Sequence, residues 1–150
     1  MRDADAFEDT VFLGLARAAK KDPYRLSLFG QHLESDERPV IVLPVQGGTL
    51  LVTDRRLVEL RAHLEVHGAW NVKEFRGYAV HRAFERTSFR TVDHVIRAAS
   101  DAVGSRRIED ILVLGTANGA EELLVSRGPE PTLLDAEFTV LREAVLGRHP

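Results

Sequence analysis

The chain has 150 residues, enough for one domain with a sizeable core, and 44% of them are hydrophobic and 29% charged. It has no cysteine, which excludes a disulfide framework, a thiolate nucleophile and a cysteine-based metal site. The net charge of −3 lacks the strong basic excess of nucleic-acid-binding domains, so a nucleic-acid partner is not expected.

No apolar run approaches the roughly 18 residues of a membrane-spanning helix. The first five residues, MRDAD, are acidic where a secretory signal would be basic and then apolar, so we expect a cytoplasmic protein. Charge is unevenly distributed along the chain. Residues 73–107 carry 8 basic and 4 acidic side chains, and this mildly basic stretch is suited to an anionic partner.

The N-terminal part is predicted to be helical. Apolar residues repeat at helical spacing from residue 7 to residue 18, with acidic residues in the first turns and Lys20-Lys21 near the other end, which favours a helix of four to five turns. A second, short helix is predicted from Tyr24 to Leu33, with an apolar side formed by Leu26, Phe29 and Leu33.

Two apolar runs, 40–45 and 49–53, flank Gln46-Gly47-Gly48, and this pattern predicts a tight hairpin. Residues 58–67 then alternate between apolar and polar, which is typical of a strand with one buried and one wet face. The same stretch also fits a helix, because Leu57, Leu60 and Leu64 are spaced at i, i+3 and i+7. That alternative would leave a second apolar stripe on the helix.

Further along the chain, residues 70–84 are predicted to form one or two irregular strands with a bulge or bend at Gly77. Residues 92–103 place their apolar side chains on one helical stripe, with Thr91 as the N-cap and Gly104 after the end, so a helix is predicted there.

The last two predicted elements are a hairpin and a helix. The runs 108–116 and 120–127 flank Asn118-Gly119, which favours a type I′ turn. A C-terminal amphipathic helix is predicted from Thr132, as its N-cap, to a stop at Gly147.

Short strands in hairpins followed by an amphipathic helix suit an α+β fold in which a small antiparallel barrel or curled sheet is capped by the C-terminal helix. The segment Gly48-Thr49-Leu50-Leu51-Val52-Thr53-Asp54-Arg55-Arg56-Leu57-Val58 resembles the second and third strands of bacterial pleckstrin-homology-like (PH-like) and GRAM-like domains. This resemblance covers residues 38–147 and implies a PH-like domain at 38–150 after an N-terminal helical extension at 1–37. It also implies a lipid- or protein-binding module. Phosphoinositide-binding members carry Lys and Arg around the first hairpin, which here is Gln46-Gly47-Gly48-Thr49, so inositol-lipid binding is not expected.

Six arginines are candidate ligand- or partner-binding residues. Arg55 and Arg56 follow Asp54, where they form either an anion site or a turn fixed by side-chain hydrogen bonds. The other four alternate with aromatic residues and form either a basic face for an acidic partner or a solvated sheet face: Arg76, Arg82, Arg86 and Arg90.

His63, Glu65 and His67 form the strongest metal-like pattern, since imidazole and carboxylate suit zinc. On an extended strand the outer two residues lie about 13 Å apart, too far to share one ion without help. Asp93, His94 and Ser88 could form a triad only if the fold brought them together.

The main functional hypothesis is a non-enzymatic PH-like binding module without a cofactor, whose partner is a protein or a second copy of the chain, with an anionic membrane surface as a further candidate. The rival is a small metal-dependent hydrolase that uses the His/Glu strand face. A third interpretation, in which 55–67 is a helix, is a regulatory or chaperone-like α+β protein.

Overall fold

Strands dominate the structure, a computed structural model that describes residues 3–17, 22–68, 72–100 and 106–147. The α-helices are α1 (Pro23–Gly30) and α2 (Asp135–Leu146). The 3-10 helices are η1 (Ala4–Phe7), η2 (Gly14–Ala16) and η3 (Arg86–Ser88). The strands are β1 (Val11–Phe12), β2 (Pro39–Val45), β3 (Gly48–Thr53), β4 (Arg56–His67), β5 (Val72–Glu85), β6 (Phe89–Ser100), β7 (Arg106–Thr116) and β8 (Gly119–Gly128).

The first sheet has the order β1-β2-β3-β4-β5, in which β2 to β5 form an antiparallel meander. The predicted first hairpin is confirmed, with Val45 opposite Gly48 and a two-residue turn between them. Gly47 has φ +81°, which a side chain would strain, and a Cβ on Gly48 would lie 1.9 Å from the Leu60 carbonyl oxygen. Both glycines are therefore required by the backbone.

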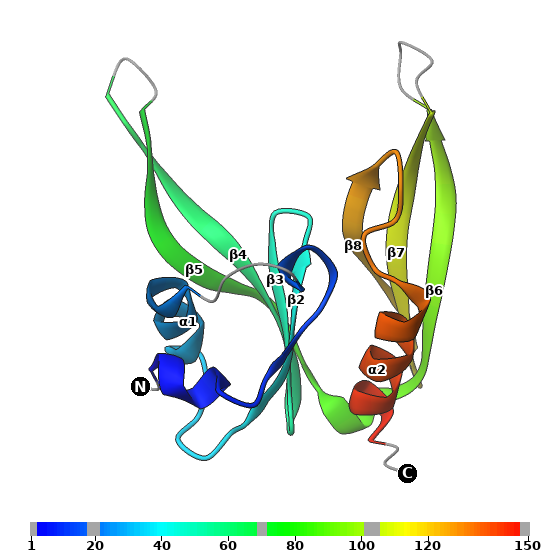
Figure 1. Ribbon diagram of the computed structural model, residues 1–150, viewed down its shortest axis with the longest axis horizontal. Coiled ribbons are helices and arrows are strands. Elements are labelled where there is room, and N and C mark those ends of the chain that lie inside the picture. The colour runs from blue at the N-terminus through cyan, green and yellow to red at the C-terminus, as the bar shows by residue number, and fades with distance from the viewer. Residues whose placement is uncertain (1–2, 18–21, 69–71, 101–105, 148–150) are drawn as a thin grey trace.

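The second sheet has the order β6-β7-β8, and α2 lies against it (Figure 1). The predicted second hairpin is confirmed, although Thr116 pairs with Gly119, so the turn is Ala117-Asn118 and begins one residue before Asn118-Gly119. The predicted C-terminal helix is also confirmed and ends at Gly147, which has φ +69°. These observations establish an α+β fold. Within the described residues the two sheets are separate, and no closed barrel forms.

The predicted helix at 92–103 is wrong, because this segment is strand β6. Its full length pairs with β7, from Phe89 opposite Thr116 to Ser100 opposite Arg106. The β-branched residues Val92, Val95 and Ile96 fit a helical stripe, but they also favour a strand, and pairing with a neighbouring strand decides between the two. Gly104 lies outside the described residues.

The predicted helix at 7–18 is also wrong. The chain instead forms η1, the two-residue strand β1 and η2, because β1 adds to the first sheet in parallel with β2, with Val11 opposite Ile41. The Thr10 hydroxyl donates a 2.9 Å hydrogen bond to the Pro39 carbonyl and fixes this docking. Residues 18–21 lie outside the described part. The second predicted helix is confirmed as α1, capped by the Asp22 side chain.

The predicted N-cap of the C-terminal helix is wrong, and the predicted bulge at Gly77 is confirmed. The N-cap of α2 is Leu134 and not Thr132, whose N–H donates to Asp110 instead. Residues 72–85 form one strand, and Gly77 with φ +89° lies at a shift in its register with β4, as the predicted bulge requires. Trp70 is outside the described residues.

Strand β4 confirms the strand interpretation of 58–67 and excludes the helix, but the expected alternation of buried and wet faces is wrong. The four residues Leu57 to Leu60 are all buried, whereas residues 61–66 are all exposed. The reason is that both faces of the first sheet are covered at its base, while the β4–β5 hairpin projects beyond this body (Figure 1).

Two hydrophobic cores cover the two faces of the first sheet. The larger core lies between the two sheets and α2, and its fully buried members include Leu43, Leu112 and Leu141. The smaller core lies between the first sheet and the N-terminal elements, where Phe7 and Phe29 pack on Val42, Leu51 and Val58. Successive residues of β2 therefore face different cores. In the described part of the chain, no helix is long and apolar enough to cross a membrane.

Candidate functional site

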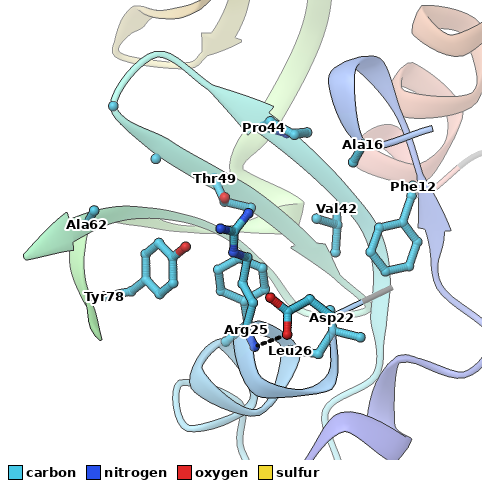
Figure 2. A pocket seen from close by; sticks show the side chains of 13 residues that line it. Phe12, Ala16, Asp22, Arg25, Leu26, Val42, Pro44, Thr49, Ala62 and Tyr78 are labelled. Atoms are coloured by element: carbon cyan, nitrogen blue, oxygen red, sulfur yellow. Dashed lines mark hydrogen bonds between the residues drawn. The ribbon is translucent and has the colours of Figure 1, made fainter. Parts of the chain in front are cut away.

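A cleft of about 300 Å³ opens between the first sheet, α1 and the segment from β1 to η2 (Figure 2). Its walls are mainly apolar. They are formed by Phe12, Ala16, Asp22, Arg25, Leu26, Phe29, Val42, Pro44, Gly47, Gly48, Thr49, Ala62 and Tyr78. Small molecules and side-chain anchors bind in apolar concavities of this kind that contain a few polar groups.

The cleft exists because small residues face a short helix. Helix α1 has only 8 residues, and its buried side chains Leu26 and Phe29 cover only part of the sheet face. Opposite them lie Gly47-Gly48 and Ala62, which supply little side-chain volume. Tyr78 forms one wall, with its ring centroid 4.7 Å from that of Phe29.

Three polar groups converge on the mouth of this cleft. Figure 2 shows the guanidinium of Arg25 and the hydroxyl groups of Thr49 and Tyr78 pointing toward one another. Arg25 is exposed on the first turn of α1, and its side chain has no ion pair with any described residue. The Asp22 carboxylate also lines the cleft, but it makes no ion pair with this guanidinium and instead accepts the backbone N–H groups of Tyr24 and Arg25 at 3.1 and 3.3 Å. The mouth therefore offers a cation and two hydroxyl groups.

An apolar stripe continues from the cleft along the projecting hairpin. The Phe75 ring lies 5.3 Å from that of Tyr78 in an edge-on arrangement, and Phe75 pairs with Leu64 across β4 and β5. Leu64, Val66 and Phe75 are 50%, 57% and 41% exposed. Ala62, Leu64 and Val66 alternate along β4 and so share one face of the hairpin. We refer to Leu64, Val66 and Phe75 as the hairpin stripe.

The predicted arginines at the β3–β4 turn are engaged in fixing that turn. Arg56 donates two hydrogen bonds to Glu37, from Nη2 to Oε1 at 2.6 Å and from Nε to Oε2 at 2.9 Å. Arg55 forms ion pairs with Glu34 at 2.9 Å and Asp36 at 2.7 Å. The hydrogen bond to Asp36 raises the pKa of Arg55, and the one to Glu37 raises that of Arg56.

Glu37 is the buried partner in this turn, with its side chain fully covered. Burial alone would raise the pKa of Glu37, but hydrogen bonds from Arg56, the Thr53 hydroxyl and the Glu34 N–H together lower it. The Thr53 hydroxyl also accepts the N–H groups of Arg55 and Arg56. The motif that carries the family resemblance thus ties the segment after α1 to the first sheet.

The structure spreads the other four predicted arginines over different elements. Arg76 pairs with Glu65 at 2.8 Å and Glu74 at 3.3 Å on the hairpin. Arg82 bridges the two sheets through the buried Glu59 at 2.7 Å and Glu121 at 3.1 Å.

Arg86 donates to backbone carbonyls, including that of Ala144 in the last turn of α2, a position that complements the negative end of a helix. Arg90 is exposed on β6, with no ion pair to a described residue. These arginines do not come together as one basic face.

The predicted metal pattern lies on the exposed half of β4. His63 is exposed, Glu65 is paired with Arg76, and the side chain of His67 is outside the described set. No group of three or more metal-ligating side chains is close enough to hold an ion within the described ranges. Ser88, Asp93 and His94 do not assemble either, since Ser88 and His94 are separated along an extended segment by about 20 Å at roughly 3.3 Å per residue.

His94 instead makes a short hydrogen bond to the buried Asp110, which lies on the neighbouring strand. The other carboxylate oxygen of Asp110 accepts the N–H groups of Thr132 and Leu133, each at 3.0 Å. The His94 ring also stacks on Phe138 of α2, with ring centroids 5.2 Å apart. This arrangement anchors the start of α2 to the second sheet.

A second carboxylate joins the N-terminal segment to α2. Glu137 accepts hydrogen bonds from Arg17 Nε at 2.9 Å, from the Gly14 N–H at 3.2 Å and from the Leu134 N–H at 3.0 Å. Burial would raise the pKa of Glu137, but these hydrogen bonds outweigh it and lower the pKa.

Comparisons with models of protein families, with curated proteins and with solved structures find no match.

Proposed function

We propose that this protein is a non-enzymatic, PH-like binding module that takes a polypeptide partner in the cleft between α1 and the first sheet. The observation that carries the proposal is the continuity of an open apolar cleft with the hairpin stripe. Contiguous exposed apolar surface on a soluble domain is typical of a binding site.

The order of the elements supports the PH-like part of the proposal. The antiparallel meander of β2 to β5 is followed by a second meander of β6 to β8, and α2 then packs on the second sheet (Figure 1). Antiparallel strands in hairpins followed by a C-terminal helix agree with the PH-like domain that the resemblance at residues 48–58 implies. The N-terminal segment and α1 are then not an accessory, because they form one wall of the site.

A polypeptide fits the geometry better than an anionic membrane surface. The arginines at positions 55, 56, 76 and 82 all have carboxylate partners, which offsets the charge that an anionic surface would need. Measurement of the oligomeric state distinguishes a second copy of the chain in the cleft from a separate polypeptide.

The test uses 1-anilinonaphthalene-8-sulfonate, a fluorescent probe that combines apolar rings with one negative charge. We expect the protein to bind one probe molecule per chain and Ala62→Phe to weaken binding about tenfold or more, because the new ring fills the cleft. Ala79→Phe is the matched control, since Ala79 is exposed on the adjacent strand opposite Arg61 and does not line the cleft.

Equal binding by both variants, or no binding by the unmodified protein, would overturn the proposed site. Sedimentation at several protein concentrations completes the test. A stable dimer that dissociates in Ala62→Phe but not in Ala79→Phe would identify a second copy as the occupant and contradict the proposal of a separate partner.

A further inference from the structure

We infer that the cleft binds the C-terminal residue of a polypeptide, with an apolar side chain inside the cleft and the terminal carboxylate on Arg25. This inference rests on the proposed function and specifies the chemistry of its ligand. It makes Arg25, Thr49 and Tyr78 the polar end of the site.

The charge at the mouth selects the polar group of the ligand. Arg25 is a cation without an ion pair among the described residues, and two hydroxyl groups point toward it (Figure 2). A guanidinium forms two parallel hydrogen bonds with a carboxylate, and hydroxyl groups can donate to the same oxygens. The Asp22 carboxylate, which also lines the cleft, is held by the backbone N–H groups at the start of α1, so Arg25 supplies the positive group that faces a ligand with one negative charge.

The closeness of Arg25 to the apolar lining of the cleft determines where on the ligand the carboxylate must be attached. Arg25 lines the same cleft as the apolar side chains of Leu26 and Val42, so a carboxylate bound to Arg25 lies next to an apolar part of the ligand. The C-terminal residue of a polypeptide has this arrangement, because its carboxylate and its side chain are attached to the same Cα atom. The side chain of an internal Asp or Glu carries a carboxylate without an apolar group beyond it.

The hairpin stripe distinguishes a polypeptide from a free fatty acid. From Ala62 in the cleft to Val66 in the hairpin stripe, β4 extends about 13 Å at roughly 3.3 Å per residue, the length of about four extended residues. The residues that precede a bound C-terminus can cover Phe75 and Leu64, which are 41% and 50% exposed. A fatty acid would fill the cleft with its tail and leave the stripe uncovered.

The experiment measures binding by isothermal titration calorimetry to the acetylated hexapeptides SVSVAL and SVSVAF, each with a free C-terminal carboxylate or a C-terminal amide. We expect at least one free acid to bind about tenfold or more tightly than its amide, which is the scale of a charge-assisted hydrogen bond. In Arg25→Gln we expect the acid and the amide to bind equally weakly.

Arg90→Gln is the matched control, because Arg90 is also exposed and unpaired among the described residues but lies on the second sheet. It should retain the preference for the acid. A second control compares the hexapeptide with the acetylated dipeptide AL. The hexapeptide should bind more tightly to the unmodified protein, and Phe75→Ser should remove this advantage.

Equal binding of acid and amide, or loss of the preference in Arg90→Gln, would overturn the inference. Binding of octanoate without binding of either peptide would also overturn it and would identify a fatty acid as the ligand. In both cases the fluorescent probe still tests the cleft itself. If the unmodified protein binds 1-anilinonaphthalene-8-sulfonate and Ala62→Phe does not, the cleft is a binding site although its ligand is not a C-terminal residue, so the two proposals fail separately.

Discussion

The two faces of the first sheet differ in how completely they are covered. One face packs on the second sheet and on α2, whose 12 residues are anchored by Asp110 at the start and contacted by Arg86 at the end. The other face has only the N-terminal segment and the 8 residues of α1. The covered face forms a continuous core, whereas the partly covered face leaves the cleft and the hairpin stripe.

This difference separates stability from binding in the molecule. Side chains of the larger core contribute apolar burial that the fold requires. The hairpin stripe keeps apolar side chains in water, which contributes little to stability and is suited to a partner. Substitutions in the larger core should therefore lower the free energy of unfolding, whereas substitutions on the hairpin stripe should weaken binding.

The largest expected effect is on the covered face. Leu141→Ala removes a fully buried side chain from the larger core and should lower the free energy of unfolding by about 3 kcal/mol, because it leaves a cavity. Urea denaturation measures this value, and an unchanged m-value would show that the denatured state is the same. A loss below about 1 kcal/mol would contradict the description of this core.

Glu37→Gln should have the next largest effect. It removes the charge that Arg56 pairs with and weakens the link between the segment after α1 and the first sheet. We expect the free energy of unfolding to fall by about 2 kcal/mol. This is less than the loss caused by breaking a fully buried ion pair, because Arg56 is partly exposed. Glu34→Gln is a matched control at the same turn with an exposed carboxylate, and an equal loss there would refute the role of burial.

Glu137 should make stability depend on pH in the acid range. Because its pKa is lower in the folded state, its contribution is present above its unfolded value of about 4.3 and is lost as the pH falls through the folded pKa. Glu137→Gln should therefore be less stable than the unmodified protein at pH 7, and the difference should shrink toward pH 3. Urea unfolding midpoints of both proteins from pH 7 to pH 3 measure this pH dependence. A stability difference that grows as the pH falls would contradict the lowered pKa of Glu137.

The smallest effect on stability is expected on the hairpin stripe. Phe75→Ser should change the free energy of unfolding by about 1 kcal/mol or less, because the residue is 41% exposed and belongs to neither hydrophobic core. The same change should weaken binding of the hexapeptide, as described above. Thermal unfolding gives the stability, and a large destabilisation would place Phe75 in the core instead of on the binding face.

The local turns were predictable, and the tertiary context was not. Gly47-Gly48 and Asn118-Gly119 marked both hairpins because glycines lie in or directly after the two-residue turns. Residues 92–103 were mistaken for a helix because three β-branched residues fit both periods, and only pairing with β7 selects the strand. The wet face expected for β4 failed at Leu57 and Glu59 because the sequence does not show that the second sheet covers this face of the first sheet.

The candidate site was less accessible to sequence analysis than the fold. The sequence identified Leu26 and Phe29 as an apolar helix face, but Arg25, Thr49 and Tyr78 are far apart in the chain and meet only because α1 folds back on the sheet. The predicted arginines were conspicuous in sequence, yet their carboxylate partners, such as Glu37 and Glu59, were visible only in three dimensions.

The most direct test of the binding site is to titrate the free-acid hexapeptide acetyl-SVSVAL into ¹⁵N-labelled protein and to follow the backbone amide resonances. We expect the shifted resonances to cluster at α1, at the β2–β3 turn and at residues 62–66 and 73–78, with the second sheet unchanged. Shifts that cluster on β6 to β8 would contradict the proposed site. The absence of shifts at peptide concentrations of several millimolar would also contradict it, because a Kd of about 1 mM would already give mostly bound protein.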